Sequence, residues 1–263
     1  MRRLAAIAAL WAAIPLADVR GSELRLAAPR AGCLLDDDGQ LRLLLGLPGG
    51  FLPGPPVRSG VLSAACGDGF LLVKTAETLE WLEPGGALIR SWNVPGGPAL
   101  FAWAPDGSRA LVHLPSSSEW LLVTAGELRP VPLNWEERHG EVLAVAFGEL
   151  EQVAAVVRSA ERLWLLQARL SDGVITQQDE LAEASAPILL LDDGAILWGA
   201  GEGLLMETRT GIRRRIPMPA SPTGLEAMSG HWIRVKLAGG QGHLAVRLSG
   251  DREELYRLPE VGR

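Results

Sequence analysis

Short apolar runs alternate with glycine-containing turns along most of the chain. The segment Phe101–Leu114, FAWAPDGSRALVHL, shows the pattern, with an apolar run, Asp106-Gly107 and a second, mostly apolar run. Glycine readily adopts the positive φ that a tight hairpin turn requires, and Asp tolerates it. The segment therefore predicts two antiparallel strands joined by a tight turn.

The same unit recurs along the chain. Turns fall near residues 39, 69, 107, 150, 194 and 230, at spacings of 30, 38, 43, 44 and 36 residues. An apolar strand precedes each turn, another strand follows it, and a third strand and a more polar fourth strand complete most units. Four short strands in about 40 residues are typical of one blade of a β-propeller.

The repeat predicts an all-β fold, a single β-propeller of four-stranded blades over residues 22–263. Six turns favour six blades, and seven would require an extra unit within Gly46–Ser59. The apolar runs Leu100–Trp103, Val142–Phe147 and Ile188–Leu191 are expected to be innermost strands. We expect Leu24–Ala27 to supply the outer strand of the last blade and to close the ring. A β-sandwich would instead need longer strands of about equal burial.

One unit carries a family resemblance. Phe101 to Arg109, FAWAPDGSR, resembles the aromatic-x-Pro-Asp-Gly-x-Arg/Lys core of the WD40-like (PD40) propeller repeats of TolB-type periplasmic proteins. The resemblance covers about one blade, and only the acidic-Gly or Ser-Gly turn remains in the other units. It implies a four-stranded blade with the motif on its first hairpin, in a family whose members commonly bind other proteins.

The N-terminus has the three parts of a secretory signal peptide, which we assign to residues 1–21. Arg2 and Arg3 precede an apolar run from Leu4 to Ala17, and small residues follow. The run is short for a membrane span, which needs about 20 apolar residues. We therefore expect export of a bacterial protein to the periplasm or the medium, with no stable membrane span after cleavage.

Two cysteines, Cys33 and Cys66, are the only ones in the chain. Two cysteines do not make a disulfide framework, although they can pair in an oxidising compartment. Both lie in apolar, strand-like stretches, and cysteine is among the most frequently buried residues. The interpretation that we favour is therefore two buried free thiols.

The chain contains no recognisable catalytic motif, so we expect no catalytic residue, no cofactor and no metal ligand. It lacks a Gly-x-Ser-x-Gly elbow and a phosphate-binding loop, and its four histidines stand at 113, 139, 231 and 243 without a ligand at metal spacing. The run Asp36-Asp37-Asp38-Gly39 has Leu41 where a calcium loop requires glycine, so it predicts a hairpin turn. A net charge of −6 gives no positive field for nucleic acid.

One polar segment stands out as a candidate protein-contact loop. It follows a predicted outer strand and contains Trp135, Glu136, Glu137, Arg138 and His139. Tryptophan and arginine are common anchors of protein interfaces, and loops commonly carry function. The alternative, which we favour, is a solvated loop whose Trp135 folds back onto the blade.

Three functions remain open. The first is a monomeric, non-catalytic propeller that binds another protein or an envelope component. The second is a propeller enzyme (a hydrolase, a lyase or a quinoprotein-like oxidoreductase) with its site at the mouth of the central channel. The third is a propeller with a purely structural role in a larger complex. The side chains that line the channel discriminate best between them.

Overall fold

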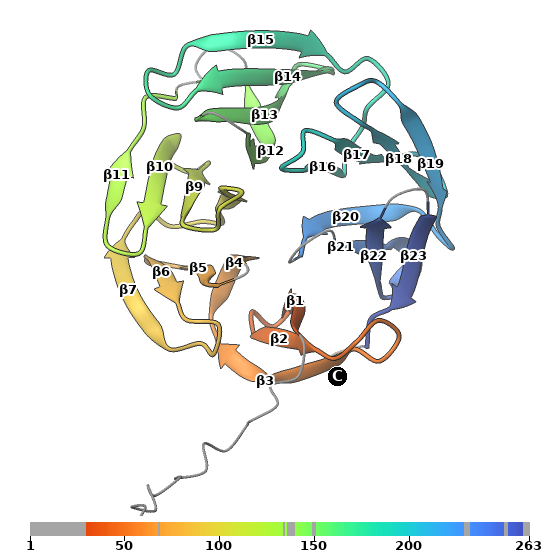
Figure 1. Cartoon of the computed structure of the whole chain (residues 1–263), viewed down its shortest axis with the longest axis horizontal. Helices are drawn as coiled ribbons and strands as arrows, with labels where there is room; N and C mark the ends of the chain where they lie inside the picture. The colour runs from red at the N-terminus through yellow and green to blue at the C-terminus, as the bar shows by residue number, and fades with distance from the viewer. Residues whose placement is uncertain are drawn as a thin grey trace, which may run out of the picture.

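The chain folds into a ring of six antiparallel sheets around a central channel (Figure 1). This computed structural model describes residues 30–67, 69–133, 135, 140–148, 151–228, 232–249 and 252–259. Each sheet is a meander of strands that follow one another in sequence, with the first strand at the channel and the last at the rim. The predicted six-bladed β-propeller is thus confirmed.

The strands are numbered in chain order and grouped into blades. Blade 1 contains β1 (Arg30–Leu35), β2 (Leu41–Leu45) and β3 (Leu52–Arg58); blade 2 contains β4 (Val61–Cys66), β5 (Leu71–Thr75), β6 (Thr78–Leu82) and β7 (Leu88–Asn93); blade 3 contains β8 (Leu100–Trp103), β9 (Arg109–Leu114), β10 (Glu119–Thr124) and β11 (Leu128–Pro130). Blade 4 contains β12 (Glu141–Phe147), β13 (Gln152–Ser159), β14 (Arg162–Arg169) and β15 (Ile175–Glu180); blade 5 contains β16 (Ile188–Leu190), β17 (Ile196–Gly199), β18 (Gly203–Glu207) and β19 (Arg213–Pro217); blade 6 contains β20 (Pro222–Ala227), β21 (Trp232–Leu237), β22 (His243–Ser249) and β23 (Arg252–Arg257), with a short 3-10 turn at Ala238–Gly240.

The hydrophobic core lies between the blades. The second strands β5, β9 and β13 are mostly apolar on both faces, because each face packs against a neighbouring blade, and their central valines are fully buried. The outer strands β7 and β15 have mostly exposed side chains. Side-chain burial is therefore greater in the inner strands of a blade than in its outer strand, which explains why each repeat begins apolar and ends polar.

The first blade has three strands among the described residues. Its outer strand β3 contains Pro53, Pro55 and Pro56, and proline lacks the N–H that a further strand would need, so it is found on sheet edges. β3 also occupies the region 46–59, where a seventh blade would have required an extra unit. Among the described residues the outer strand of blade 6 is β23. The segment Leu24–Ala27, which was expected to supply an outer strand there, lies outside the described part of the chain.

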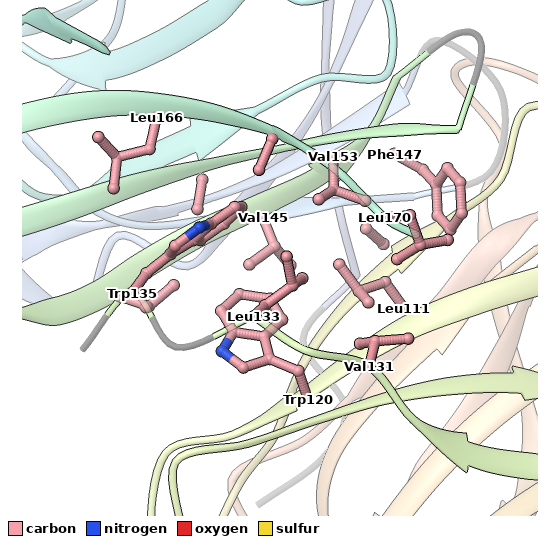
Figure 2. Packing of buried hydrophobic residues seen from close by; sticks show 14 of the residues in the cluster. Leu111, Trp120, Val131, Leu133, Trp135, Val145, Phe147, Val153, Leu166 and Leu170 are labelled. Carbon is pink, nitrogen blue, oxygen red and sulfur yellow. The ribbon is translucent and has the colours of Figure 1, made fainter. Parts of the chain in front are cut away.

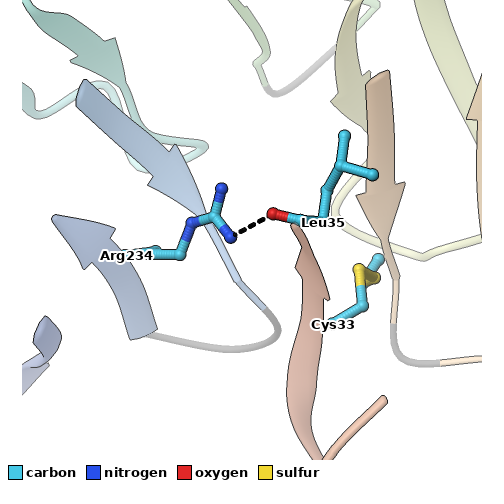
Figure 3. The surroundings of a disulfide bond; sticks show 4 residues. Cys33, Leu35 and Arg234 are labelled. Atoms are coloured by element: carbon cyan, nitrogen blue, oxygen red, sulfur yellow. Dashed lines mark hydrogen bonds between the residues drawn. A yellow bond between two sulfur atoms is a disulfide. The ribbon is translucent and has the colours of Figure 1, made fainter. Parts of the chain in front are cut away.

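Among the described residues, side chains rather than shared strands close the ring between blades 1 and 6. The Arg234 guanidinium, which is 7% exposed, donates a hydrogen bond of 2.9 Å to the Leu35 carbonyl oxygen (Figure 3) and another of 2.7 Å to Glu226. Phe51 from blade 1 packs edge-on against Trp232, with ring centroids 5.4 Å apart, and against Tyr256 at 6.0 Å.

A disulfide between Cys33 and Cys66 joins blade 1 to blade 2 (Figure 3), so the favoured prediction of free thiols was wrong. The two cysteines lie on the inner strands β1 and β4 of adjacent blades, and their Cα atoms are 6.0 Å apart, which suits a disulfide. Burial preference alone favours a thiol, because it ignores that consecutive inner strands lie side by side in a propeller.

Candidate functional site

The inner strands surround a central cavity of about 870 Å³. Segments of all six blades line it, with most of the wall formed by β4, β8, β12, β16 and β20. Alanines and partly exposed leucines form much of the wall. We take this channel as the candidate functional site.

Each inner strand contributes one partly exposed leucine to the wall of the channel. Depth is counted back from the residue that closes the first hairpin of each blade, for example Cys66 opposite Leu71 or Trp103 opposite Ala110. On this scale Leu35 has a depth of zero residues, Leu189 of one, Leu225 of two and Leu100 of three. Leu62 and Leu143 both have a depth of four residues. We call this set the leucine staircase, and it makes the wall apolar from one mouth of the channel to the other.

Irregularities in strand pairing place the two deepest leucines. The register of β4 with β5 shifts between Val61 and Ser63, and that of β12 with β13 shifts between Val142 and Ala144. In each case the skipped residue is the leucine, and a bulged residue leaves the ladder and re-aims its side chain. Leu62 is 44% exposed as a result, which is unusual for a leucine on an inner strand.

The two mouths of the channel differ chemically. The first hairpins of the blades all lie on one face, because every blade runs up and down in the same order, and this mouth is lined by Asp106, Asp192 and Asp193. We call it the acidic mouth. The opposite, apolar mouth lies where the inner strands begin, beside Leu62 and Leu143.

The carboxylates of the acidic mouth form no close ion pair among the described residues, although Arg109 lies near enough to Asp106 to favour its charged form. Within the described part of the chain, no Arg or Lys side chain forms an ion pair within 4.0 Å of Asp106, Asp192 or Asp193, whereas the lining residue Glu226 pairs with Arg234 at 2.7 Å. The fifth ionisable lining residue, Arg214, pairs with Glu253. The backbone and side chain of Ser108 hold the pKa of Asp106 below its usual value, so this carboxyl is charged at neutral pH.

The predicted contact loop is only partly described. Trp135 is 1% exposed and packs edge-on against Trp120, with ring centroids 5.0 Å apart, within the core between blades 3 and 4 (Figure 2). Its indole therefore stabilises the blade interface, as the alternative interpretation holds. Glu136, Glu137, Arg138 and His139 lie outside the described residues, so their role in binding stays a prediction.

Neither of the two described histidines, His113 and His243, lines the channel. His113 is fully buried, stacks on Trp120 at 4.2 Å and has Nδ1 3.3 Å from the Glu119 carbonyl oxygen, and burial together with Arg234 lowers the pKa of His243. His139 and His231 lie outside the described residues. No group of three or more His, Cys, Asp or Glu residues suited to a metal ion occurs in the ranges described above.

The run Asp36-Asp37-Asp38 forms the hairpin turn between β1 and β2. The Asp36 carboxylate accepts hydrogen bonds from the backbone N–H groups of Asp38, at 3.1 Å, and Gln40, at 2.8 Å. These bonds use the carboxylate to stabilise the turn, as the sequence predicted.

Comparison with known proteins supports the fold alone. No family model matches the chain, and no curated protein matches it in sequence. Among solved structures, a chain of the nidogen/laminin complex superposes with a TM-score of 0.57 at 10% identity, over 87% of this chain and 92% of that one. The WD40 domain of Neurospora crassa Pan2 gives 0.51 at 10% identity over 89% and 81%, and Kuenenia stuttgartiensis hydrazine synthase gives 0.51 at 12% over 87% and 80%.

These structures include WD40 and other β-propellers. The chain is a β-propeller. The propeller part of the predicted resemblance is thereby confirmed, whereas no finding identifies the TolB-type family. Among the described residues of this propeller, no helix is long and apolar enough to cross a membrane.

The leucine staircase escaped the sequence analysis. Its leucines occur at five different distances from the turn, so an alignment of the repeats does not superpose them. The position of each leucine in its inner strand, counted back from the first hairpin of the blade, is the sequence signal that would have identified the set. The small residues at the other wall positions distinguish these leucines from the core.

Proposed function

We propose that this propeller is an exported, non-catalytic module of the TolB-like type that binds another protein at the apolar mouth of its channel. The observation that carries the proposal is the exposed leucine at that mouth, Leu62, with Leu143 two blades farther round the ring. Exposed apolar side chains gathered at one mouth of a channel are typical of interaction sites.

The surroundings of the apolar mouth support a protein partner. The strand that carries Leu143, β12, begins on the same face, directly after the connection from β11. This connection includes the charged loop residues Glu136, Glu137 and Arg138, which would form a polar rim beside an apolar centre, the usual arrangement of an interface. The remaining connections between blades share this face.

Export is supported by two features. The N-terminal 21 residues have the pattern of a signal peptide, and the Cys33–Cys66 disulfide is of the kind that persists in the periplasm or outside the cell. We infer that the mature propeller, from residue 22 onward, works there.

Site-specific photocrosslinking in the producing cell tests the binding surface. A photoreactive amino acid at position 62 should crosslink to one discrete protein, and the additional change Leu143→Asp should abolish the adduct. The control places the same amino acid at Ile212, which is 66% exposed and faces away from the channel lining. Identical adducts from both positions, or turnover of a substrate by the purified protein without any adduct, would contradict the proposal.

A further inference from the structure

We propose that the channel also binds a small amphiphile with an elongated aliphatic body and a positively charged end. The aliphatic body would lie along the leucine staircase, and the cation would lie at the acidic mouth. This site goes beyond the proposed protein contact, which it meets only at Leu62 and Leu143, because it uses the interior of the channel and the opposite mouth.

The size and lining of the channel suit such a molecule. Its volume of about 870 Å³ falls in the range of small-molecule pockets, about 300–1,000 Å³. The staircase extends over four residue steps, and a strand rises about 3.3 Å per residue, so the apolar wall is roughly 13 Å long. Water inside an apolar wall makes few hydrogen bonds, and its release on binding favours an apolar occupant.

The charges at the acidic mouth specify the end group. Asp106 comes from the β8–β9 hairpin in blade 3, while Asp192 and Asp193 come from the β16–β17 hairpin in blade 5. The lining ions Glu226 and Arg214 are already paired, with Arg234 and Glu253. The three aspartates therefore leave negative charge at the point where the apolar wall ends, and a partly enclosed mouth focuses that field on a cation.

Wall and mouth together exclude other classes of ligand. A purely aliphatic molecule would leave the carboxylates without a partner, and a fatty acid would bring a second negative charge to them. A compact polar cation would leave the leucines in contact with water. A long-chain alkylammonium ion satisfies both parts of the channel.

Titration calorimetry with the oxidised protein tests the proposal. The probe is dodecyltrimethylammonium, kept below its micelle concentration. It is compared with dodecyl sulfate, which has the opposite charge, and with tetramethylammonium, which lacks the chain. We expect saturable binding of one dodecyltrimethylammonium per chain, at least tenfold weaker binding of dodecyl sulfate and no measurable binding of tetramethylammonium.

Two sets of variants assign the binding to the channel. Leu100→Asn and Leu225→Asn, in the middle of the staircase, should each weaken binding at least tenfold, whereas Ile212→Asn on the rim should not change it. The triple change Asp106→Asn, Asp192→Asn and Asp193→Asn should remove the preference for the cation. Its control, Glu77→Gln with Glu127→Gln and Asp179→Asn, removes three carboxylates outside the channel lining and should retain the preference.

Several results would overturn the proposal. Equal binding of both dodecyl probes would refute the role of the acidic mouth, and non-saturable binding that survives the leucine changes would place the probe on the surface. Because the comparison of the three probes uses the unaltered protein, the proposal can fail even if a variant does not fold. Circular dichroism in the presence of each probe checks that the protein stays folded. If the dichroism signal decreases over the same probe concentrations at which heat is measured, the heat comes from unfolding, and this result would also contradict the proposed site.

Discussion

Single residues in this propeller depart from the role that their polarity suggests. Trp135 lies in a polar connection but is buried, and Leu62 lies on an inner strand but is exposed. The reason is local in both cases. Edge-on packing against Trp120 holds the indole in the core, and the irregular register of β4 with β5 leaves Leu62 exposed at the channel wall. For these two residues, contacts and strand pairing in the folded protein determine burial more than the polarity of the adjacent sequence does.

Replacing Trp135 by alanine should therefore destabilise the fold. Removing a buried tryptophan costs about 3–5 kcal/mol, because apolar burial is lost and a cavity remains. Equilibrium denaturation in urea measures the loss as a lower midpoint. Ile212→Ala, at a side chain that is 66% exposed, should change stability by no more than about 0.5 kcal/mol. A Trp135 variant as stable as the parent would restore this residue as a candidate for partner contact.

Turns and strands were the elements that the sequence predicted well. The acidic-Gly turns allow little freedom in where the adjoining strands begin, and alternation or continuous apolar character distinguishes outer from inner strands. Not every glycine in a turn is required for the same reason. Gly107 and Gly173 both have positive φ, at +66° and +69°, but only Gly173 lies against another segment, where an added Cβ would overlap the Pro132 carbonyl oxygen.

This difference predicts unequal effects of two matched substitutions. Gly107→Ala should cost about 1–2 kcal/mol, the price of a left-handed backbone for a residue with a Cβ. Gly173→Ala should cost a further 1–3 kcal/mol, because the turn between β14 and β15 must move away from the connection 131–133. Thermal melts of the two variants measure the difference, and equal melting temperatures would show that this turn is not packed as described.

The sequence predicted the blades but little of how they meet. Repeated turns such as Asp106-Gly107 are encoded locally, so the strands beside them were placed within one or two residues. The pairing of Cys33 with Cys66, the contact of Arg234 with Leu35 and the leucine staircase each depend on separate blades coming together. In each of these contacts the partner residue belongs to a different blade, so the local sequence pattern does not predict the contact.

At the scale of the whole molecule, blade 1 is the point where the ring is completed. It is fastened to blade 2 by the disulfide and by the ion pair between Arg58 and the buried Glu80. It meets blade 6 through Arg234 and the aromatic contacts of Phe51. In a closed ring each blade is covered on both faces by its two neighbours. Loss of the contacts of blade 1 would expose apolar faces to water, so the stability of every blade depends on these contacts.

Reduction of the disulfide should therefore lower the stability of the whole propeller. For a separation of 33 residues, loop-closure entropy gives a loss of roughly 3–4 kcal/mol. The urea midpoint with and without dithiothreitol measures it, and a Cys33→Ser, Cys66→Ser double variant should match the reduced protein and show no response to dithiothreitol. If the parent does not respond either, the two thiols are not joined in the folded protein.

The same disulfide sets how the molecule would respond to force. A pull on the two chain ends enters at β1, crosses from Cys33 to Cys66 through the sulfur atoms, and bypasses the residues between them. The rest of blade 1 then carries no tension while the bridge is intact, and the ring yields first where blades 1 and 6 meet, since no covalent bond joins them there. Reduction would add the bypassed segment, a sequence separation of 33 residues, to the extensible length, roughly 110 Å at full stretch. The oxidised propeller thus has a mechanically shielded segment beside its weakest joint.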